Sequence, residues 1–347
     1  MSALDWDRTE TRVALRESLA DMQARAGSGL LEHLIDAEIP WIGISTHDGG
    51  AGGDLGDAAI AVRTLATMEL DAPIAETGLV CGWALASCGL QLERQLMAPA
   101  FELGTSLTGI AVDGVVRVSG HVDEVPGALA AQAIITTVEI DGVLQLCAVA
   151  IADAAVTSTV NLADESRCSL TYVSAPVVAS APLAAGLTRF DLLARLALAR
   201  AIQSCGALTE LRDLTIGYAR TREQFGRPLS DLQVIAQMLA ELAELTLSAQ
   251  AAVAAAIERP GTWQSAIAKS VTGRAARRAA ALAHQVHGAM GMSQEYPLGR
   301  LTTRLWSWTE EAGRPELWEA WIGEQFLLQS SPVLWDTVVN GVRGESA

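Results

Sequence analysis

One long helical stretch and its abrupt end constrain the fold of this chain most. From Phe190 to Arg220, apolar residues recur every three or four positions, which is the spacing of one face of an amphipathic helix. About thirty residues in a helix make a rod of roughly 45 Å. Gly226 and Pro228 then end the pattern, because glycine adopts the left-handed conformation past a helix end and proline cannot continue a helix. The sequence therefore predicts a domain built on long, packed helices.

A second helical pattern begins directly after this break. Ser230 and Asp231 are favourable N-cap residues, and the spacing predicts a helix from Gln233 to Ile257. The break is therefore a helix–helix corner, and it is the first candidate functional site. It gathers a permanent cation, two amides and an aromatic ring, namely Arg222, Gln224, Gln233 and Phe225.

The corner resembles a motif of the acyl-CoA dehydrogenase family, in which Arg-x-x-Phe-Gly precedes a helix that begins near a glutamine. Downstream, the stretch from Gln285 to Gly291 resembles the family's Gln-x-x-Gly-Gly-x-Gly motif, with Ala289 in place of the second glycine. Glu295-Tyr-Pro and Arg300 resemble the Glu-x-Pro-x-x-Arg continuation. The order and spacing of the motifs fit the family, and the resemblance is clearest over residues 186–313. The alternative is that both motifs only end and pack helices.

Helical patterns stand on both sides of a β-rich middle segment. Asp113-Gly114 and Asp141-Gly142 are strong hairpin signals within it. The predicted strands span residues 105–111, 115–122, 131–139, 143–151 and 170–177. The predicted N-terminal helices span residues 9–38, with a break near residues 27–29, then 57–69 and 76–92. We therefore predict an α+β, mainly α protein with the acyl-CoA dehydrogenase fold. Its domains would be an N-terminal helical domain, a small β-barrel or sandwich domain and a C-terminal four-helix bundle, over residues 1–104, 105–184 and 185–347.

The resemblance implies a flavin cofactor. Members of the family hold FAD across a dimer interface, where one subunit's β domain holds the isoalloxazine ring. The neighbour's C-terminal domain holds the diphosphate and adenosine. A permanent guanidinium beside a diphosphate, with amide donors around it, is chemically sound. Carried over by position, the residues that would bind a neighbour's FAD are Arg222, Gln224, Phe225, Gln233, Gln285 and Gly288.

The β-domain half of this cofactor site departs from the family pattern. Where the family carries Thr-Glu-Pro-x-x-Gly-Ser-Asp, the chain from Leu107 to Gly114 shares only Leu107 and Thr108. The family's Trp-Ile-Thr, which lines the flavin face, should fall near residues 125–129 and is absent. Two explanations stay open. The β domain binds flavin through backbone amides alone, or it does not hold the ring.

The family's catalytic base is missing from both of its usual positions. The reaction removes the α-proton and the β-hydride of an acyl-CoA thioester, so it needs a carboxylate over the α-carbon. One family position falls on Leu196 and the other on Ala312. Glu310 and Glu311 precede Ala312, so a slip of one residue would make Glu311 the base. The alternative is that both are solvated acids, and the nearby Arg314 would weaken either one as a base.

Composition argues against several other classes of function. The net charge of −16 disfavours nucleic acid and anionic membranes as partners. The five cysteines are scattered, which favours buried thiols in a reducing, cytoplasmic compartment. Because no run of about eighteen apolar residues occurs, no membrane insertion is predicted. His284 and His287 have no third ligand nearby in the sequence, so no metal site is predicted.

With the resemblance, these features favour a subunit of an FAD-dependent acyl-CoA dehydrogenase, which desaturates fatty-acyl or steroid side-chain thioesters at the α,β bond. The uneven cofactor site favours a heteromer, as in the family's heterotetrameric enzymes, with base and ring site supplied by the second subunit. The expected partners are the acyl-CoA substrate, that second subunit and an acceptor of the electron-transfer flavoprotein type. Two rivals stay open: a self-sufficient homo-oligomer that uses Glu311, and a flavin-free scaffold subunit.

Overall fold

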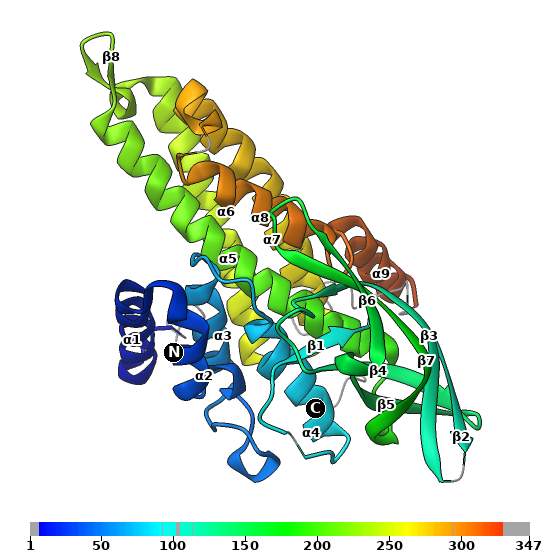
Figure 1. Ribbon diagram of the computed structural model, residues 1–347. Coiled ribbons are helices and arrows are strands. Elements are labelled where there is room, and N and C mark those ends of the chain that lie inside the picture. Colours follow the sequence, from blue (N-terminus) through cyan, green and yellow to red (C-terminus); the bar gives the residue numbers. More distant parts are fainter. Residues whose placement is uncertain (1–6, 92, 102–104, 113, 294, 329–347) are drawn as a thin grey trace. The chain divides into compact units, whose positions relative to one another are not determined.

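The structure is a computed structural model. It describes residues 7–91, 93–101, 105–112, 114–293 and 295–328. Its elements divide between two compact units, which are described separately (Figure 1). The sheet unit comprises residues 9–62 and 68–199, and the bundle unit comprises residues 200–328 with 7–8 and 63–67. Along the chain the elements are helical, then β, then helical, which confirms the predicted α+β class. The finer division into three domains stays a prediction.

Helices open the sheet unit. They are α1 (Glu10–Ala26), α2 (Leu30–Asp36), α3 (Leu55–Leu65) as far as residue 62, the π-helical stretch η4 (Glu76–Gly82) and α4 (Trp83–Ser87). The predicted break between the first two is a short 3₁₀ turn, η1 (Gly27–Gly29). Arg12 of α1 pairs with Asp54 at 2.6 Å and with Asp57 at 2.8 Å, which ties α1 to the beginning of α3.

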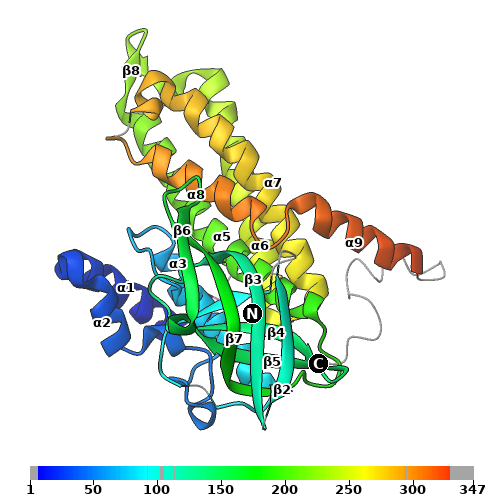
Figure 2. The same ribbon diagram turned by 45° about the vertical axis from the view of Figure 1, so that its right-hand side comes forward.

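A sheet of seven strands follows these helices in the described residues. The strands are β1 (Met97–Ala100), β2 (Ser106–Val112), β3 (Val115–Pro126), β4 (Ala133–Ile140), β5 (Val143–Ala150), β6 (Ala154–Val160) and β7 (Ser166–Pro182). Their spatial order is β1-β4-β5-β7-β3-β2, with β6 also paired to β7 (Figure 2). β1 and β4 are parallel, and the other pairs are antiparallel. Asp141 and Gly142 have φ values of 50° and 78°, as the predicted tight hairpin between β4 and β5 requires.

Long helices form the bundle unit. They are α5 (Arg189–Thr221) from residue 200 onward, α6 (Gln233–Glu258), α7 (Thr262–His287), α8 (Leu298–Glu310) and α9 (Pro315–Leu328). Their core combines leucines with alanines, whose small side chains allow close helix packing. It includes Leu208, Leu211, Leu242, Ala276, Ala279, Leu301 and Leu305. The two long helices predicted from the spacing are α5 and α6, with each end within about one residue of the prediction.

The beginning of α6 differs from the prediction. Ser230 and Asp231 lie in a 3₁₀ turn, η6 (Leu229–Asp231), and the N-cap of α6 is Leu232, which makes no side-chain cap. The Leu232 N–H donates to the Leu229 carbonyl at 3.0 Å, so this turn reorients the chain before the helix begins. The predicted N-cap was therefore wrong, because the chain needs one extra turn to leave the preceding hairpin.

α6 is long and apolar enough, by length and composition, to cross a membrane, and it is the one such helix in the described ranges. A core helix of a soluble protein passes the same test, so this is weak evidence. In this chain, 33% of its most apolar window is buried. Val234 and Leu247 are among the large apolar side chains that α6 leaves exposed.

Candidate functional site

The predicted corner after α5 is a protruding β-hairpin (Figure 1). Its strands are β8 (Glu223–Gln224) and β9 (Arg227–Pro228), which pair antiparallel. The two turn residues, Phe225 and Gly226, have φ values of 55° and 75°. Positive φ at both positions is the geometry of a two-residue type I′ hairpin turn. The Leu229 N–H donates to the Arg222 carbonyl at 2.8 Å and closes the loop.

The hairpin presents its functional groups to solvent. The side chains of Arg222, Gln224 and Gln233 are exposed, and the Phe225 ring is 87% exposed. Among the described residues, none of these four side chains makes a hydrogen bond or ion pair within the chain. A large ring in a left-handed conformation is costly, so its exposure indicates a role in binding. The cation and the amide donors of the hairpin are therefore available to a ligand or a partner.

The second motif forms the end of α7. The helix stops at His287, and Gly288 follows with a φ of 57° and opens a 3₁₀ turn, η7 (Gly288–Met292). Gln285 and Gly288 are exposed. Ala289 is exposed as well, so the methyl group at this position does not crowd the turn. The motif therefore keeps a glycine turn and an amide at its surface.

The two motifs lie at the same end of the bundle unit. Tyr218, in the last turn of α5, stacks on the ring of His287 with 4.4 Å between the ring centroids. The Arg222 N–H donates to the Tyr218 carbonyl at 2.8 Å, so the hairpin starts one turn after this stack. The structure thus brings together the predicted residues of the two motifs at one end of the bundle.

This end of the bundle fits the diphosphate half of an FAD. Arg222 supplies a permanent positive charge, and Gln224, Gln233 and Gln285 supply neutral donors. None of these groups is used elsewhere in the described part of the chain, so all of them can bind phosphate oxygens.

The sheet unit does not fit the isoalloxazine half. The hydroxyl groups of Ser106 and Thr108 donate to the backbone of β3, at 3.2 Å each. In the segment that replaces the family's Trp-Ile-Thr, residues 125–128 are buried, and a Cβ on Gly127 would lie 2.8 Å from Pro73. Leu129, which is 61% exposed, offers no polar group. The side chains that the family directs at the ring are therefore absent or already bonded.

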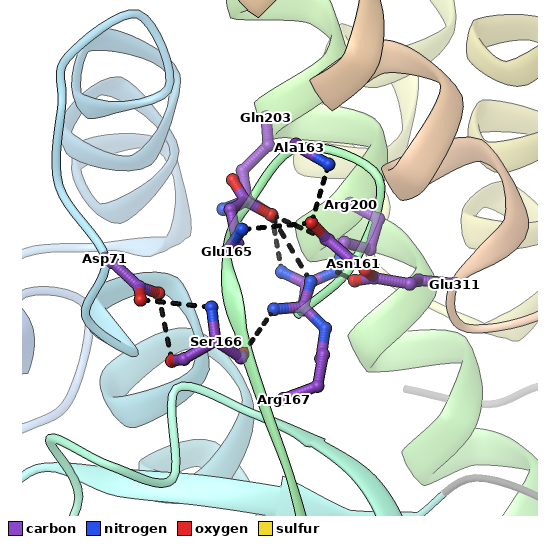
Figure 3. A network of polar contacts seen from close by, with 9 residues as sticks. All are labelled: Asp71, Asn161, Ala163, Glu165, Ser166, Arg167, Arg200, Gln203 and Glu311. Carbon is purple, nitrogen blue, oxygen red and sulfur yellow. Dashed lines mark hydrogen bonds and ion pairs between the residues drawn. The ribbon is translucent and has the colours of Figure 1, made fainter. Parts of the chain in front are cut away.

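A network of polar contacts holds the turn between β6 and β7 (Figure 3). The Asn161 Oδ1 accepts from the N–H groups of Ala163 and Glu165, at 2.9 and 3.1 Å. Glu165 in turn pairs with the buried Arg167 at 3.3 Å. Arg167 stands opposite Pro126 in the β3–β7 ladder, beside the segment that replaces the family's flavin-face residues. Sequence analysis did not predict this network.

Glu311 is the C-cap of α8 and is turned toward a buried cation. Its Oε2 lies 2.8 Å from the Arg200 Nε, and Arg200 also donates to Gln203 at 2.6 Å (Figure 3). The Glu310 carboxylate pairs with Arg277 at 2.8 Å. Sequence analysis named the nearby Arg314, which is exposed, and did not name Arg200, which is the cation paired with Glu311.

The turn after Glu311 is held rigidly. Ala312 is buried with a φ of 54°, and the Trp318 indole N–H donates to the carbonyls of Ala312 and Gly313, at 3.0 and 3.1 Å. Ala312 at the family's base position thus stays fixed. A slip of one residue that would put Glu311 in this place would break these contacts. Leu196, at the other family position, is buried and apolar.

Lys269 supports the same turn from α7. This buried ammonium group donates to the carbonyl of Trp308 and, at 3.0 Å, to that of Thr309. These are carbonyls of the last turn of α8, where the backbone oxygens have no N–H four residues ahead within the helix. Sequence reasoning missed both Lys269 and Arg200. A signal existed for Lys269, since it is the lone lysine of the chain.

In the stretches of chain that the structure describes, no group of three or more His, Cys, Asp or Glu side chains is placed to hold a metal ion. His284 instead bonds the Thr302 hydroxyl at 3.1 Å, and His287 bonds the Tyr296 hydroxyl at 3.1 Å. Both imidazoles are therefore used inside the bundle.

Comparisons with known proteins bear on the family and the fold of the chain. The model of the acyl-CoA dehydrogenase C-terminal domain matches residues 191–326. A 3-sulfinopropanoyl-CoA desulfinase of Paraburkholderia xenovorans is 34% identical over 109 residues, which are 30% of this chain and 28% of that protein. The acyl-CoA dehydrogenase IpdE2 of Mycolicibacterium smegmatis is 25% identical over 250 residues, or 72% of each chain. Among solved structures, the ChsE4-ChsE5 complex from Mycobacterium tuberculosis gives a TM-score of 0.83 at 22% identity, covering 94% of this chain and 100% of that one.

Proposed function

Because the chain belongs to the acyl-CoA dehydrogenase family, we propose that it is a subunit of an FAD-dependent enzyme that desaturates an acyl-CoA thioester. Within that enzyme it is the partner subunit, which binds the diphosphate half of the FAD and leaves the ring and the base to a second subunit. The observation that supports this most is the exposed hairpin with its unused Arg222, beside the glycine turn at the end of α7.

Each exposed group has a distinct task in this proposal. Arg222 neutralises negative charge on the diphosphate, and Gln224, Gln233 and Gln285 donate hydrogen bonds to it. Phe225 covers an apolar part of the cofactor or of the second subunit. The bound flavin supplies the hydride acceptor of the reaction. The chain's own residues therefore bind and orient the cofactor and do not carry out proton transfer.

The second subunit is proposed because this chain lacks two parts of a complete site. Ala312 and Leu196 replace the carboxylate at both family positions, and Glu311 is bound to Arg200. The Ser106 and Thr108 hydroxyls of β2 already donate hydrogen bonds to the backbone of β3. The similar ChsE4-ChsE5 structure is itself a complex of two proteins, which supports a heteromer. A steroid side-chain thioester or a fatty-acyl thioester is the proposed substrate class, and an electron-transfer flavoprotein-type protein is the proposed acceptor.

Removing the guanidinium of Arg222 tests the proposal. In the complex with its second subunit, Arg222→Ala should weaken FAD binding about tenfold to a hundredfold, since one charge-assisted contact is lost. The measurement is flavin retained per complex during dilution and gel filtration. Arg220→Ala removes an exposed arginine from the same helix end and serves as the matched control. Unchanged flavin retention in Arg222→Ala would overturn the assignment of this hairpin.

The two rivals predict different outcomes of the same experiments. A self-sufficient enzyme would bind FAD without a second protein and would lose turnover when Glu311 is changed. A scaffold subunit would give no visible flavin spectrum in any complex, and Arg222→Ala would then have no effect. Co-expression with candidate partners, followed by flavin quantitation per subunit, separates all three.

A further inference from the structure

Three aromatic rings tie the two cofactor motifs together inside the bundle unit. Tyr218 stacks on His287, and Tyr296, which precedes α8, lies 5.1 Å from the His287 ring between centroids. The Tyr218 hydroxyl also donates to the His287 carbonyl at 3.4 Å. His287 is 3% exposed and stands at the last residue of α7. The ends of α5 and α7 and the approach to α8 therefore meet at one imidazole.

The partners of His287 define its protonation state. Its Nδ1 lies 2.8 Å from the Ala283 carbonyl, which can only accept, so Nδ1 carries the proton. The Nε2 is then bare and accepts from the Tyr296 hydroxyl at 3.1 Å. Burial lowers the pKa of His287, and the neighbouring His284 lowers it further. The neutral imidazole therefore has both ring nitrogens satisfied.

This imidazole lies between the two segments proposed to hold the diphosphate. One side contacts Tyr218, whose carbonyl accepts the Arg222 N–H at the base of the hairpin. Along the chain, the residue after His287 is Gly288, whose positive φ begins the exposed turn η7. A change in the ring's position would therefore move Arg222 and the glycine turn relative to each other.

We propose that His287 is a positioning residue for the flavin half-site, and that its neutral form, held by Tyr218 and Tyr296, keeps the hairpin and the Gly288 turn in register. Protonation of Nε2 would remove the acceptor for the Tyr296 hydroxyl and place a charge in a buried site. This inference rests on the proposed function, because it concerns how that cofactor site is held.

The surroundings of His287 offer little compensation for a positive charge. The titratable groups that face it are Tyr218 from α5, Tyr296 from the approach to α8 and His284 from its own helix. The turn η7 contributes only glycine, alanine and methionine. In the described residues, no carboxylate forms an ion pair with this imidazole. Acidification should therefore loosen the half-site.

The sign of the pH effect follows from linkage. An unfolded His287 takes up a proton near pH 6.5, whereas the folded one does so at lower pH. The less ordered state binds more protons, so acidification below about pH 6.5 favours it until the lower folded pKa is passed. FAD affinity should fall over the same window.

The test uses the complex of this chain with its second subunit and measures the FAD dissociation constant by flavin fluorescence from pH 5 to 8. For the parent complex we expect FAD affinity to fall in the acidic part of this range. The fall should be about tenfold for each pH unit that separates the His287 pKa of the ordered and the less ordered states. His287→Gln should flatten that profile and weaken binding at pH 8 by about threefold to tenfold. His287→Phe, which keeps a stacked ring, should also flatten it. His47→Gln changes an exposed histidine in the sheet unit and should leave the profile unchanged.

A second readout needs no flavin. Tyr296→Phe removes only one hydroxyl, and it should speed amide hydrogen exchange at residues 222–229 and 288–292 in the full chain. Tyr172→Phe removes a buried hydroxyl in the sheet unit and should not. A parent pH profile that persists in His287→Gln and His287→Phe, or unchanged exchange in Tyr296→Phe, would overturn the inference. A parent that never retains FAD would instead sink the proposed function, and the exchange experiment would still decide the positioning role.

Discussion

At the scale of single residues, Glu311 separates a self-sufficient enzyme from a partner subunit. Its carboxylate is paired with the buried Arg200, and the next residue is held in place by Trp318. We expect Glu311→Gln and Glu310→Gln each to leave turnover of the assembled enzyme within about tenfold of the parent, because loss of a true base costs on the order of 10²–10⁴. Steady-state turnover per bound flavin is the measurement. A loss of the larger size in Glu311→Gln, with normal flavin content and assembly, would show that this chain carries its own base.

Phe225 shows a conflict between stability and binding at the residue scale. A phenylalanine with a φ of 55° is strained by about 1 kcal/mol, and its ring gains no burial within the chain. Asparagine tolerates this conformation, so Phe225→Asn should keep or raise the melting temperature while it lowers flavin retention in the complex. A melting curve and a flavin assay on the same preparation check both parts. A variant that loses stability and keeps its flavin would contradict this reading.

The residues that sequence reasoning proposed for this site are those in local motifs. Arg222 and Gln285 each stand in a short pattern, and the structure brings their segments to one end of the bundle. Arg200 and Lys269 were missed because their partners are distant in sequence. Lys269, for instance, bonds a carbonyl 39 residues away. A contact of that kind depends on how the helices pack, which a periodic pattern does not specify.

At the scale of elements, the Lys269 side chain donates hydrogen bonds to the last carbonyls of α8, whose C-cap residue is Glu311. Lys269→Met keeps the length of the side chain but leaves two buried carbonyls without this donor, which should cost about 2–4 kcal/mol of unfolding free energy. Chemical denaturation of the parent and the variant measures the difference. Arg278→Met removes another cation from α7, one that forms a surface pair with Glu241, and it should leave stability nearly unchanged. Equal effects of the two variants would contradict the capping role.

The elements themselves were largely predictable, and the exceptions have physical causes. Asp141-Gly142 marks a hairpin because both residues accept positive φ, and the structure has that hairpin. β6 was not predicted, because it pairs only with β7 in the described sheet and is almost wholly exposed, so it lacks an alternating apolar pattern. The helix–helix corner is a hairpin because Phe225-Gly226 forms a type I′ turn, whereas sequence analysis used Gly226 and Pro228 only as the end of the helix.

At the scale of the whole molecule, the chain has surfaces that a monomer would leave uncovered. The Phe225 ring is 87% exposed, and Val234 and Leu247 of α6 are 61% and 51% exposed. Apolar groups of this kind mark interaction surfaces. The proposal that the chain binds only one half of a flavin site rests on the family resemblance. It comes from sequence alone, since it depends on which motif residues are present.

Expressed without a second subunit, the chain should be largely colourless or poorly soluble. Half of the proposed flavin site and the apolar surface of α6 would lack a partner, and binding stabilises only the assembled state. Co-expression with a complete acyl-CoA dehydrogenase subunit should give a soluble yellow complex, while Arg222→Ala should reduce its flavin content. Absorbance in the flavin band per chain, combined with light scattering for the mass of the complex, measures both effects. A stable yellow homo-oligomer with one FAD per chain would defeat the heteromer and favour the self-sufficient enzyme.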